Sequence, residues 1–274
     1  GRTPANYLMA KYISQAFFVD IQFFINSESF RYKRPVAQLC TALDTVESEI
    51  YKQQYAVTAE KIVELGSPSI NLNLRYSLLK SERAADYQAL TGLGSERRIL
   101  VVGQPIEFSL WYPLLDALNA LVQSDRRYVA TIKLHPQNSH GTTEVFKSRL
   151  DSSALPAFRF LGRGDIYPLL KSHDVVIGWS SNSMIEAGSL RKGVYMIETP
   201  FVSKFMSRRT AGTIINSDNI RSTLNSFFED RSERERMLKM QNKFFEKNPE
   251  MDAMNGEHNF SARLLEAITT AERR

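Results

Sequence analysis

The chain has 274 residues, 43% of them hydrophobic, and a formal net charge of +5. This length suits one large or two medium-sized domains, and no apolar run approaches the roughly 20 residues that cross a bilayer. The single cysteine, Cys40, excludes an intrachain disulfide and favours a cytosolic location. The mild basic excess suits an anionic partner, but the sequence has no nucleic-acid-binding motif, so nucleic acid is not expected as a partner.

The first part of the chain mixes helix-like and strand-like segments. Helical spacing of apolar residues predicts a helix at 3–15, and a largely apolar run predicts a strand at 16–24. Residues 36–54 predict a strand or a helix followed by a second helix. After a Gly-Ser-Pro loop signal at 66–68, residues 73–96 predict a helical connector.

From Arg97 onward, strand-like and helix-like segments alternate. Short apolar runs predict strands at 97–103, 128–134, 157–162, 174–179 and 193–199. Helical spacing predicts helices at 108–124, 142–151, 165–173 and 181–191. This alternation argues for an α/β fold in which helices cover both faces of a parallel sheet.

Beyond Pro200 the alternation stops. Residues 207–215 predict a loop with a short strand, and amphipathic helices are predicted at 217–230, 232–248 and 260–274. We therefore predict an N-terminal domain at 1–75, a linker at 76–96 and a C-terminal domain at 97–274 that includes these helices.

Polar residues follow the ends of four predicted strands. In an open parallel sheet, ligands bind beyond the carboxyl ends of the strands. The strands are followed, in turn, by a Gly-Gln-Pro turn, a Lys-Leu-His-Pro segment, a Gly-Arg-Gly-Asp turn and a Ser-Ser-Asn-Ser cluster. The sequence therefore predicts a phosphate or nucleotide site at this edge, formed by Gln104, Lys133, His135, Pro136, Ser180, Ser181, Asn182 and Ser183.

The serine cluster is the strongest of these signals. A predicted buried strand runs directly into four polar residues, 180–183, at the start of a helix. The first N–H groups of a helix lack partners and carry partial positive charge, so they bind phosphate readily, and serine hydroxyls add donors. One serine would suffice as a helix cap, so the cluster favours an anion site over capping alone.

Lys133 and His135 form the second signal. Side chains two residues apart on a strand point to the same face. A histidine in this place can donate a hydrogen bond to a phosphate oxygen, and Pro136 keeps the following chain rigid. The alternatives are a solvent-facing or internally satisfied histidine and an ordinary surface lysine.

Glu186 lies early in the helix that follows the serines. It either provides favourable negative charge in the first turn or accepts hydrogen bonds from ribose hydroxyls. The Gly-Arg-Gly-Asp segment does not match a dinucleotide-binding fingerprint, so its glycines are expected to shape a turn.

The order of these motifs resembles the carboxyl-terminal half of GT-B glycosyltransferases. The segments "KLHP", "FLGRGDIYPLLKSHDVVIGWSSNSMIEAG" and "GVYMIETP" are most similar to bacterial enzymes of surface-polysaccharide assembly with an HP motif and a Ser-Ser motif. These enzymes include sialyl- and polysialyltransferases, capsule Kdo transferases and CDP-glycerol glycerophosphotransferases. The similarity covers residues 97–200 well and 20–68 weakly.

The resemblance implies roles for individual residues. In these enzymes the HP histidine and the serine pair hold the phosphate of a CMP- or CDP-linked donor, which implicates His135, Pro136, Ser180 and Ser181. Glu186 matches the acid of the family's "SS…EA" segment.

The resemblance also implies two Rossmann-like domains that face a cleft. The first of these is expected to be incomplete, because residues 1–75 are fewer than that domain usually needs. Its usual catalytic base is an acid, and Asp20 and Glu28 are the candidates that this sequence offers. No bound metal is expected, since GT-B enzymes do not need one and the histidines and acids lack ligand spacing.

The expected function is transfer of a sugar or of glycerol phosphate from a CMP- or CDP-linked donor to a glycan or lipid-linked acceptor. The donor is a substrate, and no further cofactor is expected. Because such acceptors are lipid-linked, the expected location is cytoplasmic, with peripheral contact at the inner face of the membrane. Two alternatives remain: an isomerase similar to UDP-GlcNAc 2-epimerase, and a non-catalytic nucleotide-sugar-binding module of a polysaccharide assembly protein.

Overall fold

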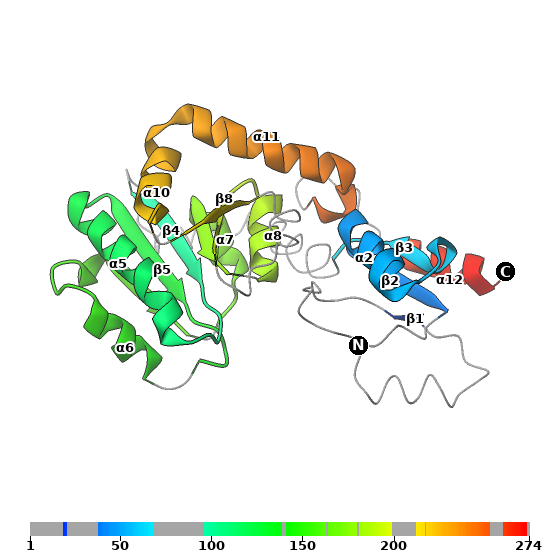
Figure 1. Ribbon diagram of the computed structural model, residues 1–274, viewed down its shortest axis with the longest axis horizontal. Helices are drawn as coiled ribbons and strands as arrows, with labels where there is room; N and C mark the ends of the chain where they lie inside the picture. Colours follow the sequence, from blue (N-terminus) through cyan, green and yellow to red (C-terminus); the bar gives the residue numbers. More distant parts are fainter. Residues whose placement is uncertain are drawn as a thin grey trace. The chain divides into compact units, whose positions relative to one another are not determined.

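The computed structural model divides the chain into two compact units (Figure 1). One unit comprises Gly1–Tyr76 and Lys243–Arg274, and the other comprises Ser77–Asn242. The residues that the structure describes are 19–20, 38–67, 96–138, 141–162, 164–179, 181–198, 212–216, 218–252 and 260–272.

The unit Ser77–Asn242 is built on a six-stranded parallel sheet with the strand order β6-β5-β4-β7-β8-β9. Its strands are β4 (Arg97–Val102), β5 (Tyr128–Lys133), β6 (Phe158–Leu161), β7 (Val175–Gly178), β8 (Gly193–Ile197) and β9 (Thr213–Ile215). The predicted strands are all present, and four of the six are buried along nearly their whole length, which explains their continuous apolar sequences.

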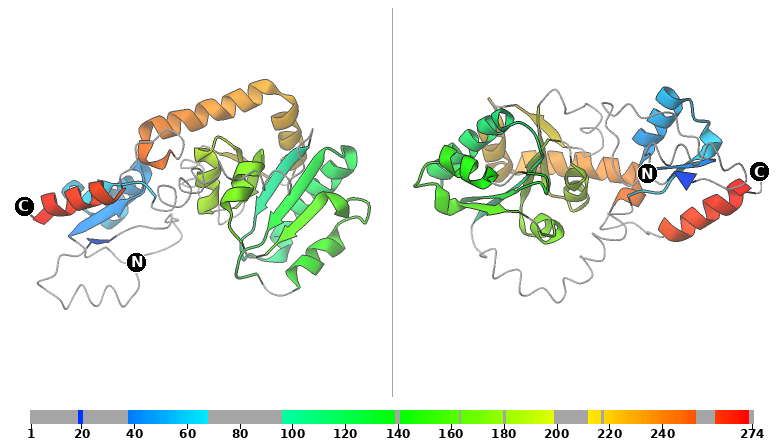
Figure 2. Two further views of the ribbon diagram at one scale, coloured as in Figure 1. Left: turned by 180° about the vertical axis from the view of Figure 1, so that it is seen from behind. Right: turned by 90° about the horizontal axis from the view of Figure 1, so that it is seen from below.

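Helices cover both faces of this sheet (Figures 1 and 2). The helices are α5 (Phe108–Ser124), α6 (Thr142–Arg149), α7 (Tyr167–Ser172), α8 (Asn182–Ser189) and α10 (Ile220–Glu229). Alternate strand residues such as Ile99 and Ile177 share one apolar core with α5, α6 and α10. Gly178 faces the opposite side, where a Cβ would lie 3.0 Å from the sulfur of Met184 on α8.

Two tryptophans mark the centre of this core. The rings of Trp111 on α5 and Trp179, which directly follows β7, lie 4.5 Å apart, and Trp111 also lies 4.6 Å from the ring of Phe146 on α6. Both indoles are almost completely buried. Such aromatic clusters contribute packing beyond the area that they bury, so they fix α5 and α6 against the carboxyl half of the sheet.

The other unit contains a three-stranded parallel sheet with the order β1-β2-β3. Its strands are β1 (Val19–Asp20), β2 (Leu39–Ala42) and β3 (Ile62–Glu64), and α2 (Thr45–Tyr55) and the short 3-10 helix η1 (Ala59–Lys61) lie between β2 and β3. Asp44 caps α2, since its carboxylate accepts a hydrogen bond from the N–H of Glu47 at 2.8 Å. Residues 36–54 therefore contain the strand-then-helix version of the two predicted alternatives.

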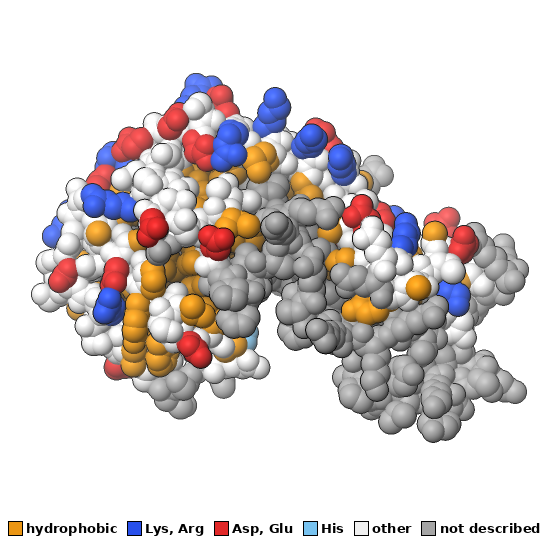
Figure 3. All heavy atoms as spheres, in the orientation of Figure 1, with side chains coloured by type: hydrophobic (Ala, Val, Ile, Leu, Met, Phe, Trp, Pro, Cys, Tyr) orange, Lys and Arg blue, Asp and Glu red, His pale blue; other side chains and the backbone are white. Residues whose placement is uncertain are grey.

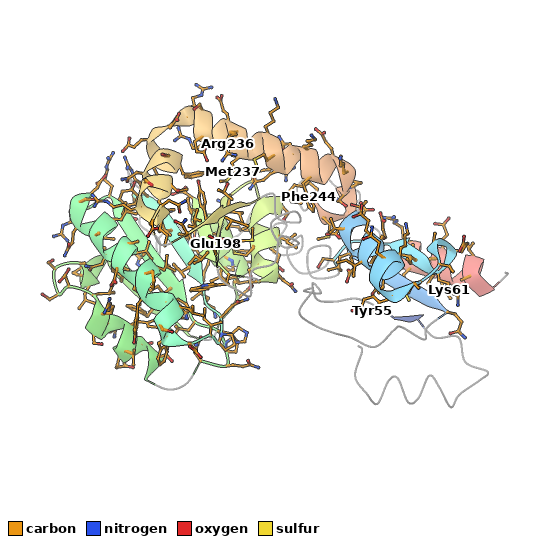
Figure 4. All side chains as sticks on the ribbon, viewed as in Figure 1. Tyr55, Lys61, Glu198, Arg236, Met237 and Phe244 are labelled. Carbon is orange, nitrogen blue, oxygen red and sulfur yellow. The ribbon has the colours of Figure 1, made fainter. Side chains whose placement is uncertain are left out.

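The last helices do not all belong where the sequence predicts them. The long helix α11 (Arg231–Lys247) begins in the unit Ser77–Asn242, where Met237 lies toward β8 (Figure 4) and its sulfur accepts a hydrogen bond from the N–H of Val194 at 3.3 Å. It is followed by the 3-10 helix η5 (Pro249–Met251) and by α12 (Phe260–Glu272).

Residues 243–274 belong to the unit of the three-stranded sheet and not to the domain 97–274 that the sequence predicts. The side-chain oxygen of Asn248 accepts hydrogen bonds from the N–H and the hydroxyl of Thr45, both at 3.1 Å, and Arg263 donates to the carbonyl of Glu64 at 2.8 Å. An amphipathic pattern shows that a helix buries one face, but not which sheet it covers, so this pairing is not visible in the sequence.

Some predicted elements cannot be compared. The predicted helix at 3–15 and the connector at 73–96 lie outside the described residues, apart from Glu96, and only β1 is described within the predicted strand at 16–24.

Candidate functional site

The strands at the centre of the large sheet end in line with one another. Val102 pairs with Lys133, Lys133 pairs with Leu161, and Val101 pairs with Ile177. The loops that leave these strands therefore emerge at a single carboxyl edge. This register brings together the chain segments that contain Gln104, Lys133, His135 and Ser181, as the sequence predicts for a parallel sheet.

Lys133 is the most unusual charge at this edge. Only 8% of the residue is exposed, and its ammonium group donates to the carbonyls of Leu134, at 3.3 Å, and Gly162. Among the described residues no carboxylate pairs with it. Burial lowers the pKa of the Lys133 ammonium below its ordinary value. An almost buried ammonium group that has carbonyl acceptors but no counterion among the described residues would be stabilised further by an anion, so the site is suited to a phosphate.

His135 begins a tight turn two residues after this lysine. The N–H of Asn138 donates to the carbonyl of His135 at 2.9 Å, and Pro136 occupies the second position of the turn, which its fixed φ favours. His135 is half-buried, while Pro136 is exposed. Burial and then the charge of Lys133 lower the pKa of the His135 imidazole, so the ring is neutral near pH 7.

Gly103 lets β4 approach this turn closely. Its N–H donates to the carbonyl of Lys133 at 2.8 Å. A Cβ at this position would lie 2.8 Å from that carbonyl oxygen and 3.0 Å from the backbone nitrogen of His135, so a larger residue would displace the turn. The neighbouring Gln104 is half-buried at the same edge.

The start of α8 shows how the serine cluster is used. The hydroxyl oxygen of Ser181 accepts a hydrogen bond from the N–H of Ser183 at 3.3 Å, so Ser181 is the N-cap. The cap uses the hydroxyl oxygen as an acceptor and does not require the hydroxyl hydrogen. Ser181, Asn182 and Ser183 are all half-buried. Ser180 lies outside the described residues.

Glu186 lies in the second turn of α8 and not in the first, which contains no acid. The interpretation of Glu186 as a first-turn charge is therefore wrong. Only 4% of the residue is exposed, and the hydroxyl of Tyr167 on α7 donates to its carboxylate at 3.5 Å. Nothing in the sequence spacing identifies Tyr167 as a partner, because the contact depends on how α7 and α8 pack.

Of the two candidate catalytic acids, the structure describes Asp20, which lies in the unit of the three-stranded sheet. Asp20 ends β1, where its backbone pairs with Cys40 of β2. Glu28 lies outside the described residues. Their assignment as the catalytic base stays a prediction. Within the part of the chain that the structure describes, no three His, Cys, Asp or Glu side chains lie close enough to hold a metal ion.

No protein-family model matches the sequence, and no curated protein matches it. Solved structures do resemble the fold. UDP-GlcNAc 2-epimerase from Neisseria meningitidis, bound to UDP-GlcNAc, matches with a TM-score of 0.68 and 15% identity over 86% of this chain and 62% of that one. The S. aureus MnaA–UDP structure matches with a TM-score of 0.66 and 16% identity over 87% of this chain and 62% of that one.

The wall teichoic acid polymerase TagF matches with a TM-score of 0.52 and 14% identity over 87% of this chain and 57% of that one. The chain thus spans about three fifths of the length of these structures. At such identities the likeness shows the fold alone, which is the predicted α/β fold of the GT-B class with parallel sheets and flanking helices.

Proposed function

We propose that this chain is the donor-binding part of a nucleotide-sugar-dependent enzyme of the GT-B class. The observation that supports this most directly is Lys133, an almost buried ammonium group whose hydrogen bonds with the described residues all go to carbonyl oxygens at the carboxyl edge of the sheet. The neighbouring imidazole and the start of α8 add neutral donors. Together they suit a phosphate group better than an uncharged ligand.

In the proposed reaction, a sugar or glycerol phosphate moves from a CMP- or CDP-linked donor to a surface-glycan acceptor. The leaving phosphate gains negative charge as its bond to the transferred group breaks. Lys133, His135 and Ser181 would stabilise this charge through donors that are already in place, and Ser180 is expected to add a further hydroxyl. Glu186 would accept hydrogen bonds from the ribose hydroxyls. An acid of the other unit, Asp20 or Glu28, would take the proton of the acceptor hydroxyl.

The epimerase alternative is supported by the TM-scores, which are higher for the two UDP-linked structures than for the polymerase. Such an enzyme would use a UDP-sugar and need no acceptor. A non-catalytic binding module would bind a nucleotide without turnover. The site at the carboxyl edge serves all three proposals in the same way, so the nucleotide and the need for an acceptor distinguish them.

The experiment that tests the proposal is calorimetric titration of the protein with CMP, CDP, UMP, UDP and GDP. We expect one of these nucleotides to bind, with CMP or CDP favouring the transferase and UDP favouring the epimerase. Binding of none of them would contradict the proposed site. Incubation with UDP-GlcNAc and no acceptor, followed by sugar analysis, then separates isomerase from transferase.

A peripheral membrane contact is also proposed. On α11, Lys239, Lys243 and Lys247 recur every four residues, all are exposed, and no described residue forms an ion pair with them. Figure 3 shows lysine and arginine side chains along this helix. Each lysine near an anionic membrane contributes about 1 kcal/mol. In the described residues, no helix has the length and hydropathy of a membrane span.

The membrane proposal is tested by co-sedimentation with vesicles of phosphatidylcholine that contain phosphatidylglycerol as the anionic lipid. Replacement of the three lysines by glutamate should release the protein, and pure phosphatidylcholine vesicles serve as the control. Equal sedimentation of both proteins would refute this contact.

A further inference from the structure

Three hydrogen bonds define the turn that follows β5. The N–H of His135 donates to the side-chain oxygen of Asn138 at 2.6 Å, and the N–H of Asn138 donates to the carbonyl of His135 at 2.9 Å. The N–H of Gln137 donates to Nδ1 of the His135 ring at 3.1 Å. The first and third of these bonds fix the backbone and the imidazole of the same residue.

The hydrogen bond from the His135 N–H to Asn138 forms just beyond the last backbone hydrogen bonds between β5 and its neighbouring strands. The N–H of Leu134 still bonds across to Leu161, and the carbonyl of Lys133 accepts from Gly103, which directly follows β4. His135 is the next residue of this ladder, and its N–H has no strand partner. The carboxamide oxygen of Asn138 takes that place, so the side chain of Asn138 continues the sheet by one residue.

The bond from Gln137 determines where the imidazole proton lies. A backbone N–H can only donate, so Nδ1 must present its lone pair, and the ring proton must be on Nε2. Protonation of Nδ1 would set two N–H groups against each other. Lys133 is the charged group that acts on this ring among the described residues, and its positive charge also disfavours an imidazolium.

We propose that Asn138 is a positioning residue that holds His135 as a neutral imidazole whose Nε2–H donates to the phosphate of the bound nucleotide. This inference rests on the proposed function for the identity of the ligand. The inference gives two side chains different roles at the site. Lys133 supplies the positive charge, and His135 supplies a directed hydrogen bond. Asn138 does not touch the ligand and acts through His135.

The first test measures the tautomer of His135 in the ligand-free protein by 15N NMR of the imidazole rings. The chain has four histidines, and His135→Gln assigns the signal by removing it. We expect an Nε2–H ring at pH 7, and a mixture of tautomers in Asn138→Ala. A charged ring, an Nδ1–H ring, or an unchanged tautomer in Asn138→Ala would overturn the inference. If Asn138→Ala does not fold, Asn138→Ser replaces it, since it also lacks the Oδ1 acceptor.

The second test compares steady-state kinetics of Asn138→Ala with those of a matched control, Asn119→Ala. Asn119 makes the same type of bond, since its side-chain oxygen accepts from the N–H of Asp151 at 3.1 Å, but it lies on α5 and has no part in the site. We expect Asn138→Ala to lower kcat about tenfold with little change in KM, because a misdirected donor mainly affects the leaving phosphate. Asn119→Ala should retain full kcat. Equal kcat values for the two variants would count against the role of Asn138.

The two tests separate this inference from the proposed function. An Nε2–H ring in a protein that binds no nucleotide would leave the tautomer assignment intact and refute the proposed ligand. Nucleotide binding to a protein with a charged or Nδ1–H ring would do the opposite.

Discussion

The large sheet has a buried cation at each of its two strand ends, and the two cations differ in their hydrogen-bond partners. Arg97 at the amino edge and Lys133 at the carboxyl edge are each 8% exposed. The guanidinium of Arg97 bonds Glu229 at 2.5 Å and the Tyr128 hydroxyl at 2.9 Å, and Asp125 lies 3.4 Å away. Within the part of the chain that the structure describes, the Lys133 ammonium donates to two carbonyl oxygens and to no carboxylate.

The electrostatic consequence of this difference is also opposite. Burial lowers the pKa of Arg97, but its side-chain hydrogen bonds with Tyr128 and Glu229 outweigh burial and raise it. At Lys133 burial has no such opposition and lowers the pKa. Arg97 at the amino edge is therefore paired within the fold, whereas no carboxylate of the described residues pairs with Lys133 at the carboxyl edge. Four measurements test this difference between the two edges.

The largest effect is expected at His173, which precedes β7 at the amino edge. The residue is 3% exposed, Nδ1–H donates to the carbonyl of Leu169 at 2.7 Å, and Nε2 accepts from the Thr131 hydroxyl at 2.8 Å. Burial lowers the pKa of His173 from 6.5 to about 4. The unfolded chain therefore binds a proton at a higher pH than the folded chain does.

Stability should accordingly fall by about 3 kcal/mol as the pH drops from about 6.5 to about 4. Urea unfolding across this pH range measures the loss. In His173→Gln the same part of the pH dependence should disappear, and the difference between the two curves removes the contribution of other groups. Parallel curves for the two proteins would show that His173 does not titrate in this way.

An effect of similar size is expected for His135→Ala. Removal of one preoriented donor to a leaving group typically costs about 2.7–4 kcal/mol of transition-state stabilisation, so kcat should fall at least about a hundredfold. Thermal unfolding should be almost unchanged, because the hydrogen bond that this half-buried ring makes with the described residues lies within its own turn. Full activity in this variant would remove His135 from the proposed site.

Arg97→Met should mainly affect stability. The change removes a charged group that bonds Tyr128 and Glu229, and such bonds contribute about 1.5–3 kcal/mol. We expect the free energy of unfolding to decrease by about 2 kcal/mol and nucleotide affinity to stay the same. Denaturant titration and calorimetry measure the two quantities. A loss of affinity equal to that of a site variant would contradict the division between the edges.

Lys133→Met should show the reverse pattern. Nucleotide affinity should fall about tenfold, because a charged hydrogen bond to the phosphate is lost. The free energy of unfolding should stay within about 1 kcal/mol, because a buried cation without a counterion among the described residues is replaced by an apolar side chain of similar length. The same two methods apply. Strong destabilisation with unchanged affinity would assign Lys133 to the fold and leave the phosphate without its cation.

Much of the fold is predictable because it depends on local pattern. Continuous apolar runs predict the buried strands, and helical spacing predicts α5 at its observed bounds, Phe108–Ser124. The short strand β3 is not predicted, since its sequence Ile-Val-Glu is too short to show a period. The association of α12 with the smaller sheet is also not predictable, because it depends on contacts about 200 residues apart, such as that of Arg263 with Glu64.

The candidate site is predictable in place but not in detail. The rule that parallel strands present their carboxyl ends together locates Lys133, His135 and Ser181. Which of these groups already has a partner depends on the packed structure. Ser181 caps a helix, Glu186 is buried beside Tyr167, and Asn138 accepts from the His135 N–H at the point where the ladder from β4 has ended.

The two tryptophans of the chain both belong to the unit Ser77–Asn242, where Trp111 and Trp179 touch and Trp179 is followed within two residues by Ser181. Tryptophan fluorescence of the unmodified protein therefore originates at one place, between the end of β7 and the start of α8. A red shift during heating would report melting of this unit alone, while the unit that contains α2 and α12 would melt without an optical signal from tryptophan.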